Sequence, residues 1–196
     1  GGRALGPSPR SRHAFKVLCP ELLVTSIMGP RGATKDQIQQ ETGSKLIVSN
    51  RGEHYPSTGL RTLVIHSDEV QGILAAVACV IDKIAECGEQ ERATGPSGPE
   101  PEFIGKEPGE YVLKALIPMK ASGAIIGRQG ANIAALRDEF NAKVFIDKNS
   151  VQGHQMLKTI ATADNLKAVA VRINDCVQEE CRADYFQDWA QLRAFD

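Results

Sequence analysis

The sequence predicts an α+β protein in which one small domain occurs twice, each time with its elements in the order β-α-α-β-β-α. Two observations predict this fold class. Sliding the sequence by 98 positions superposes residues 14–50 on residues 112–148 without a gap, which indicates an internal repeat. In each copy, short apolar runs typical of strands alternate with stretches whose apolar residues keep helical spacing.

Three strands are expected in each copy. The first strand of each copy ends at a proline, which cannot continue a central ladder. The expected strands are Ala14 to Cys19, Lys45 to Ser49 and Arg61 to His66 in the first copy, and Tyr111 to Ile117, Lys143 to Asp147 and Leu157 to Ala161 in the second.

Three helices are also expected in each copy. A short helix leads to a pair of glycines, a second helix follows that pair, and a long amphipathic helix closes the copy. The second helices are expected at Ala33 to Thr42 and Ala131 to Phe140, each ended by a residue that suits the left-handed region, Gly43 or Asn141. The closing helices have apolar residues at Val70, Ile73, Leu74, Val77, Ile81 and Ile84, and at Leu166, Val169, Ile173 and Val177.

The segments between and around the copies differ from them in composition. Residues 88–109 are rich in Gly, Pro and Glu and poor in apolar residues, so we expect a flexible linker that reaches about 25 Å. The expected organisation is a disordered N-terminal segment at 1–12, a first domain at 13–87, the linker at 88–109, a second domain at 110–183 and a C-terminal helical extension or tail at 184–196.

The C-terminal segment carries several aromatic residues at near-helical spacing. One interpretation is a helical extension that packs on the second domain, and the alternative is a contact with a partner or with the first domain. These residues are Tyr185, Phe186, Trp189, Leu192 and Phe195.

Bulk composition excludes several classes of function. The formal net charge is −1, so a nucleic-acid role depends on where charges are placed and not on overall basicity. The five cysteines include no C-x-x-C and have no histidine at ligand spacing, which predicts neither a disulfide framework nor a metal site. No acid–base or nucleophilic constellation is present, so we expect no catalytic residues and no cofactor. The four histidines are expected to face solvent.

Neither a secretion signal nor a membrane span is expected. The stretch from Gly1 to Phe15 lacks an apolar core, and the longest apolar stretch, Ile73 to Ile81, is too short to cross a bilayer. These features predict a soluble intracellular protein.

The glycine pairs carry a family resemblance. The stretch from Ala124 to Glu139 reads AIIGRQGANIAALRDE, and the stretch from Ser26 to Lys45 reads SIMGPRGATKDQIQQETGSK. Both contain G-x-x-G between two helices, and together with the element order they resemble the type I KH domain, in its poly(C)-binding and Nova-type branch. The resemblance implies that each copy is a three-stranded antiparallel sheet packed on three helices.

The resemblance also implies a binding site in each copy. In KH domains the G-x-x-G loop clamps the backbone of a short single-stranded RNA while an apolar groove receives the bases. Two glycines before a helix N-terminus suit this role, because the backbone can approach phosphates closely and the free N–H groups favour anions. The RNA-binding residues implied in the first copy are Gly29, Pro30, Arg31, Gly32, Thr25, Ser26, Met28, Lys45, Leu46, Val48 and Arg61. Those implied in the second copy are Gly127, Arg128, Gln129, Gly130, Gly123, Ala124, Ile126, Arg137, Lys143, Val144 and Ile146.

Some positions depart from the family pattern. Pro30 removes one backbone donor, and Lys35 stands where the family usually has an aliphatic residue, so weaker binding is expected in the first copy. In the second copy either Gln155 or Met156 takes the place of Arg61, which predicts a different or a relaxed base preference. A helix–helix turn without a ligand is the alternative interpretation of each loop.

The leading functional hypothesis is a non-enzymatic, single-stranded RNA-binding protein that acts in post-transcriptional regulation of mRNA in the nucleus or cytoplasm. One alternative is a KH-fold protein-interaction scaffold that binds a protein partner or self-associates through the last helix or the aromatic tail. The other is a single-stranded DNA binder, because little in such a groove must contact a 2′-hydroxyl.

Overall fold

The computed structural model describes residues 3–4 and 11–195. The predicted element order occurs twice, which confirms the α+β fold class. The first repeat contains β2 (His13–Cys19), α1 (Glu21–Met28), η1 (Pro30–Gly32), α2 (Ala33–Thr42), β3 (Lys45–Val48), β4 (Arg61–Ser67) and α3 (Val70–Thr94). The second repeat contains β5 (Glu110–Pro118), η2 (Met119–Ala121), α4 (Ser122–Ile126), η3 (Arg128–Gly130), α5 (Ala131–Glu139), β6 (Lys143–Val151), β7 (His154–Thr162) and α6 (Ala163–Gln178).

The strands of both repeats form one antiparallel sheet of six strands, in the order β3-β4-β2-β5-β7-β6. The repeats join where β2 pairs with β5, and Val17 lies opposite Ala115. These two residues are equivalent under the shift of 98 positions that relates the repeats. Antiparallel strands that pair through equivalent residues are related by a local two-fold axis perpendicular to the sheet. The edge strands β3 and β6 therefore lie at opposite sides of the sheet and run in opposite directions.

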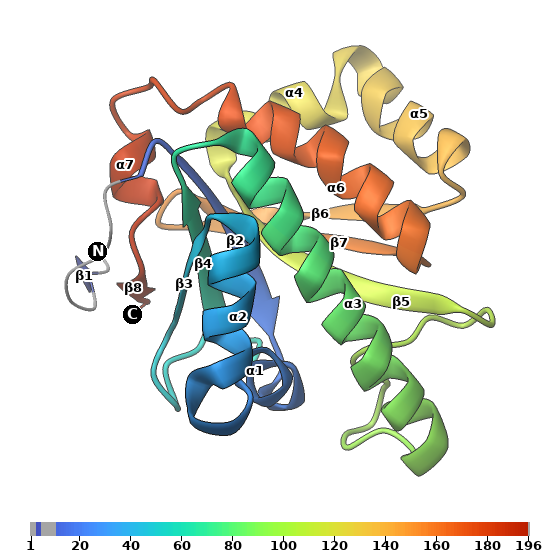
Figure 1. The fold of residues 1–196 in the computed structure, drawn as a ribbon. Coiled ribbons are helices and arrows are strands. Elements are labelled where there is room, and N and C mark those ends of the chain that lie inside the picture. The colour runs from blue at the N-terminus through green and yellow to red at the C-terminus, as the bar shows by residue number, and fades with distance from the viewer. Residues whose placement is uncertain (1–2, 5–10, 196) are drawn as a thin grey trace.

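The helices of both repeats cover one face of this sheet, with α3 and α6 packed side by side across its middle (Figure 1). A single hydrophobic core continues through both repeats and includes Leu63, Ile73, Leu113 and Ile173, each at most 3% exposed. The core is therefore continuous across the boundary between the two repeats.

The region predicted to be a flexible linker is structured at both of its ends. Residues 88–94 are the last turns of α3. Gly88 lies inside this helix and does not end it. Glycine is needed at this position because a Cβ would lie 2.6 Å from the Tyr111 ring. The buried Glu91 carboxylate accepts hydrogen bonds from the backbone N–H groups of Glu102 and Phe103, at 2.8 and 2.9 Å, and Phe103 is buried. The Glu91 carboxylate thus fixes the segment that leads toward β5.

The C-terminal segment folds back onto the sheet. It contains α7 (Phe186–Trp189) and β8 (Arg193–Ala194), and β8 pairs with β1 (Arg3–Ala4). Residues 3–4 of the N-terminal segment that was predicted to be disordered are therefore in a strand, while residues 1–2 and 5–10 lie outside the described residues. Phe186 and Trp189 of this segment are buried, so the chain itself covers these two aromatic side chains.

The C-terminal segment contacts both repeats, and not the second alone. Lys16 of β2 is fully buried; its Nζ lies 5.1 Å from the centre of the Trp189 ring and donates to the Gln191 carbonyl oxygen at 2.7 Å. The His154 ring of β7 also packs against Trp189. Nδ1 of His154 lies 2.9 Å from the Gln152 carbonyl oxygen, so Nδ1 carries the proton and Nε2 accepts from Lys16 Nζ at 2.8 Å. This cluster joins the two repeats beneath the C-terminal segment.

The prediction that the histidines face solvent is wrong for three of the four. His13, His66 and His154 are buried, and only His54 is exposed. Burial, together with the nearby Lys16, lowers the pKa of His154 to about 3 and that of His66 to about 4. Burial also lowers the pKa of Lys16 well below its ordinary value. Within the part of the chain that the structure describes, no helix combines the length and apolar character needed to cross a membrane.

Candidate nucleic-acid interface

The two glycine loops have the same backbone conformation. The φ and ψ angles are 67° and −178° at Gly29, and 75° and 177° at Gly127. Arg31 and Gln129 are both left-handed, with φ of 54° and ψ of 29° and 28°, and the second glycines agree equally well. Pro30 therefore leaves the loop geometry of the first repeat intact, and its effect is limited to the loss of one N–H donor.

The first glycine of each loop is required by packing as well as by backbone angle. A Cβ on Gly29 would overlap the side chain of Thr34, and a Cβ on Gly127 would lie 2.6 Å from the Cβ of Asn132. Asn132 Nδ2 also donates to the Ala124 and Ile125 carbonyl oxygens, both at 3.0 Å, which ties α5 to α4. Each loop is thus held tightly between its two helices.

The loops present positive charge to solvent in front of a helix N-terminus. Each opens directly into a helix, α2 or α5, whose N-cap is a glycine. The N–H groups of Gly32 and Ala33, and of Gly130 and Ala131, already donate to carbonyl oxygens of the loops, so the helix dipole and the arginine charge are what favour an anion here. Arg31 and Arg128 are exposed, and neither forms an ion pair with another described residue. This combination suits a phosphate group.

A groove of about 610 Å³ lies beside the loop of the first repeat, between α1 and the edge strand β3. Seven of the predicted site residues line it: Thr25, Met28, Gly29, Lys45, Leu46, Val48 and Arg61. Ser26 is not among the lining residues; its side chain lies near the Cys87 thiol of α3, whose pKa it lowers against the larger effect of burial. The remaining loop residues Pro30, Arg31 and Gly32 follow Gly29 in the chain and are not among the residues that line the groove.

The groove also contains charged residues that sequence reasoning did not assign to it. Lys35 and Arg51 add two cations, and Glu21 adds one carboxylate. Lys35 was noted only as a departure from the family pattern, although a cation at that helical position could have indicated a ligand-facing site. The sequence carries no comparable signal for Glu21, whose role depends on a residue 40 positions away.

Arg61 is fixed in position by three hydrogen bonds. Its Nε and Nη2 donate to the Ser49 carbonyl oxygen at 3.0 and 2.6 Å, and its Nη1 lies 3.2 Å from Glu21 Oε2. In the second repeat Gln155 Nε2 donates to the Asp147 carbonyl oxygen at 2.7 Å, in the equivalent place. The choice between Gln155 and Met156 is thereby resolved in favour of Gln155. The guanidinium of the first groove is replaced by a neutral amide in the second.

The second repeat has a more apolar surface at the equivalent place. Gly123, Ala124 and Ile126 are exposed on α4, opposite Val144, which is buried, and Ile146, which is half-buried. A shared groove between them stays a prediction.

The two basic residues predicted for the second groove have other contacts. Lys143 lies on the opposite face of the sheet from Val144, because side chains alternate along a strand, and its Nζ is 3.8 Å from Glu110 Oε1. Arg137 reaches from α5 to the edge of the sheet, where its Nε and Nη2 donate to the Val144 carbonyl oxygen at 3.1 and 2.7 Å. Arg137 therefore lies at the groove, and Lys143 points away from it.

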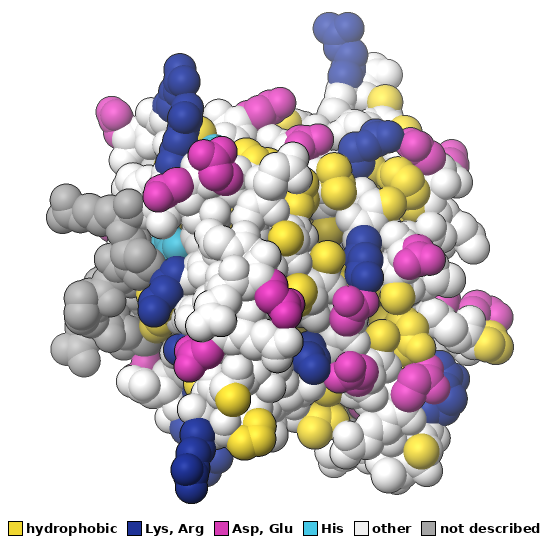
Figure 2. All heavy atoms as spheres, in the orientation of Figure 1, with side chains coloured by type: hydrophobic (Ala, Val, Ile, Leu, Met, Phe, Trp, Pro, Cys, Tyr) yellow, Lys and Arg dark blue, Asp and Glu magenta, His cyan; other side chains and the backbone are white. Residues whose placement is uncertain are grey.

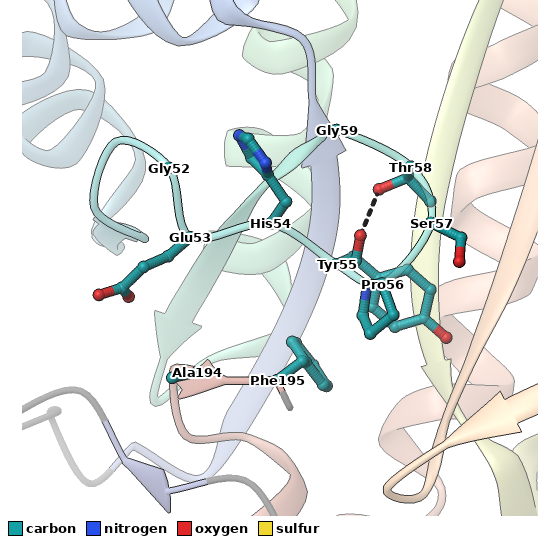
Figure 3. Close-up of a pocket in the computed structure, with 10 residues that line it drawn as sticks. All are labelled: Gly52, Glu53, His54, Tyr55, Pro56, Ser57, Thr58, Gly59, Ala194 and Phe195. Atoms are coloured by element: carbon teal, nitrogen blue, oxygen red, sulfur yellow. Dashed lines mark hydrogen bonds between the residues drawn. The ribbon is translucent and has the colours of Figure 1, made fainter.

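The surface shows no broad basic area on the helix-covered face. Figure 2 shows Lys and Arg side chains that stand apart from one another among acidic and apolar ones. A second hollow, of about 400 Å³, lies between residues 52–59 and the C-terminal Ala194 and Phe195 (Figure 3). Its lining includes no Lys or Arg. The glycine loops and their grooves are therefore the better anion sites.

Comparison with known proteins agrees with this geometry. The sequence model described as the KH domain matches residues 14–82 and 112–175. The RNA-binding protein Nova-2 of Homo sapiens is 30% identical over 140 residues, which is 67% of this chain and 27% of Nova-2. The RNA-binding protein Pasilla of Drosophila melanogaster is 26% identical over 137 residues, 69% of this chain and 17% of Pasilla. The chain thus spans less than a third of either relative. Among solved structures, Dim2p from Pyrococcus horikoshii OT3 aligns with 91% of this chain and 98% of its own at 15% identity and a TM-score of 0.29.

Proposed function

The chain belongs to the KH domain family, and on that basis we propose that it binds single-stranded RNA at two sites and acts in post-transcriptional regulation. In each repeat the glycine loop clamps the phosphate backbone and the adjacent groove reads bases. The observation that carries this proposal is the agreement of the two loops in backbone conformation, each with an exposed arginine in front of a helix N-terminus. Two relatives that share both repeats are named as RNA-binding proteins.

The two grooves would select different bases. The first offers a guanidinium, Arg61, which lines the groove and is held by Ser49 and Glu21. Such a group can donate two parallel hydrogen bonds to acceptors on a base edge. The second offers the amide of Gln155 at the same place, which donates more weakly and carries no charge. We expect the first groove to have the stronger base preference and the steeper salt dependence.

The two-fold relation between the repeats determines how one RNA could use both grooves. The edge strands β3 and β6 run in opposite directions. Two RNA segments bound in the same way in the two grooves therefore have opposite 5′-to-3′ polarity. The two edges are separated by about 24 Å, from five strand spacings of about 4.8 Å. A single RNA must therefore reverse direction between the grooves. The sheet, and not the length of a flexible linker, sets the effective concentration of the second site.

The test of the proposal is fluorescence anisotropy with short C-rich, U-rich and A-rich RNA at two salt concentrations, with matched DNA as a parallel series. Binding that depends on sequence and weakens with salt is expected, because phosphate contacts release counterions. Equal affinity for DNA would redirect the proposal to single-stranded DNA. No binding to any of the oligonucleotides would refute it.

A further inference from the structure

The sheet has a second face, which the helices leave uncovered, and the two repeats treat it differently. On this outer face the first repeat places Lys16, Val64 and Ile47 in one row across β2, β4 and β3. Lys16 and Val64 are fully buried, and Lys16 lies beneath Trp189 of the C-terminal segment. The C-terminal segment thus covers this row.

The equivalent row of the second repeat is basic and is not covered by the C-terminal segment, and its exposure rises from the half-buried Lys114 and Lys158 to the exposed Phe145. Lys114, Lys158 and Phe145 lie opposite one another across β5, β7 and β6. Lys114 is equivalent to Lys16 under the shift of 98 positions, while Lys158 and Phe145 occupy the places of Val64 and Ile47. The Phe145 ring is 51% exposed, and Lys158 Nζ lies 5.9 Å from its centre. We call Lys114, Lys158 and Phe145 the outer strip.

The two lysines of the outer strip form no ion pair with a described residue, although the Glu102 side chain lies beside Lys114. Both lysines are half-buried. Burial and then the neighbouring Lys158 lower the pKa of Lys114, which the carboxylates of Glu100 and Glu102 offset only in part. Two ammonium groups held together at a partly desolvated surface favour an anion between them.

The composition of the outer strip indicates which anion. An exposed aromatic ring beside lysines on a sheet is the arrangement on which bases of single-stranded nucleic acids stack while cations contact the backbone. The strip is also next to the second groove, because Val144 and Ile146 face the groove on one side of the edge strand β6 and Phe145 lies on the other side. An RNA segment that leaves the groove reaches the outer strip by passing round the edge of the sheet at β6.

We propose that the outer strip is an additional single-stranded RNA contact, in which a base stacks on Phe145 and the adjoining phosphates lie against Lys158 and Lys114. This inference rests on the proposed function, since it extends the path of RNA bound in the second groove. It predicts that RNA longer than the groove gains affinity from a face of the sheet that is distinct from the groove.

The experiment uses the full chain with Pro30→Asp and Arg31→Asp, so that only the second groove is active. Phe145→Ile and Lys158→Val introduce the residues that the first repeat has in the same row, and both suit a strand. The probes are a four-nucleotide RNA, which fills the groove alone, and the same sequence extended at each end. Lys83→Gln, on α3, is the matched charge control.

The expected result is that Phe145→Ile weakens binding of the extended RNA roughly tenfold and leaves the four-nucleotide RNA unchanged. Lys158→Val should reduce the slope of log affinity against log salt by about 0.7 for the extended RNA alone. Unchanged binding of the extended RNA, or equal loss for both lengths, would overturn the outer strip as a contact. If neither RNA binds the parent chain, the proposed function itself fails, which is a distinct outcome.

Discussion

Acid should unfold this protein through its buried histidines, and His154 at the junction of the repeats is the residue to test. Its Nδ1 donates to the Gln152 carbonyl oxygen and its Nε2 accepts from Lys16, so only the neutral ring fits. Protonation would charge a buried ring and remove the lone pair on Nε2 that accepts from Lys16 Nζ at 2.8 Å. The folded state therefore holds the pKa of His154 at about 3, against an ordinary value of 6.5.

The sign and size of the effect follow from proton linkage. A histidine whose pKa is lowered by folding binds its proton in the unfolded state first, so stability falls as the pH falls below about 6.5. Each such histidine lowers the free energy of unfolding by about 1.4 kcal/mol per pH unit until its folded pKa is reached. His154 contributes down to about pH 3 and His66 down to about pH 4, so their combined slope is about 2.7 kcal/mol per unit between pH 6 and 4.

The assay is urea-induced unfolding at several pH values, followed by far-UV circular dichroism and by the fluorescence of Trp189, the single tryptophan. His154→Gln removes one titrating group, and all carboxylates remain the same in both proteins. The variant should be less stable near neutral pH but should lose about 1.4 kcal/mol less stability per pH unit of acidification than the parent. If the variant and the parent give parallel curves of stability against pH, then folding does not hold His154 neutral. The contacts of His154 with Lys16 and Gln152 would then be incorrect.

Three other predictions concern the loops, the C-terminal segment and the first groove. Gly127→Ala should destabilise the chain more than Gly130→Ala in urea unfolding. Both glycines have positive φ, so Gly130→Ala should cost about 1–2 kcal/mol from backbone strain alone. Gly127→Ala should cost more because its Cβ would also overlap Asn132. Trp189→Ala should cost about 3–5 kcal/mol by circular dichroism, and a loss below about 1 kcal/mol would show that the segment does not hold the repeats together. Arg61→Met should weaken RNA binding about tenfold in a chain whose second loop is inactivated. The same change should leave RNA binding unchanged in a chain whose first loop is inactivated instead. An equal loss of affinity in both chains would contradict the place of Arg61 in the first groove.

The sequence predicted what is local and repeated. Element order and the glycine loops depend on neighbours in the chain, and a duplicated pattern reinforces each assignment. Two predicted site residues, Ser26 and Lys143, lie away from the places expected for them. In a helix or a strand a shift of one position changes the face on which a side chain lies, and family resemblance does not resolve that difference.

The joining of the repeats into one sheet was not predictable in the same way. It depends on Lys16 and Val17 pairing with Leu116 and Ala115, about a hundred positions away, and no local pattern marks that pairing. The sequence did carry one indication of this joining. The near-continuous apolar run of β2 is typical of a strand covered on both faces, and β2 is indeed buried along its whole length. Glycine at position 88 was misleading, because glycine permits close packing as well as helix ends.

The most direct test of the account is RNA binding after both glycine loops are made acidic. Pro30→Asp with Arg31→Asp, and Arg128→Asp with Gln129→Asp, change only exposed positions, and aspartate tolerates the left-handed conformation of the third loop residue better than most side chains. Each pair should remove binding at its own groove, and all four together should abolish it, with urea unfolding unchanged. Wild-type affinity and salt dependence in the fourfold variant would contradict the claim that these loops hold the phosphates.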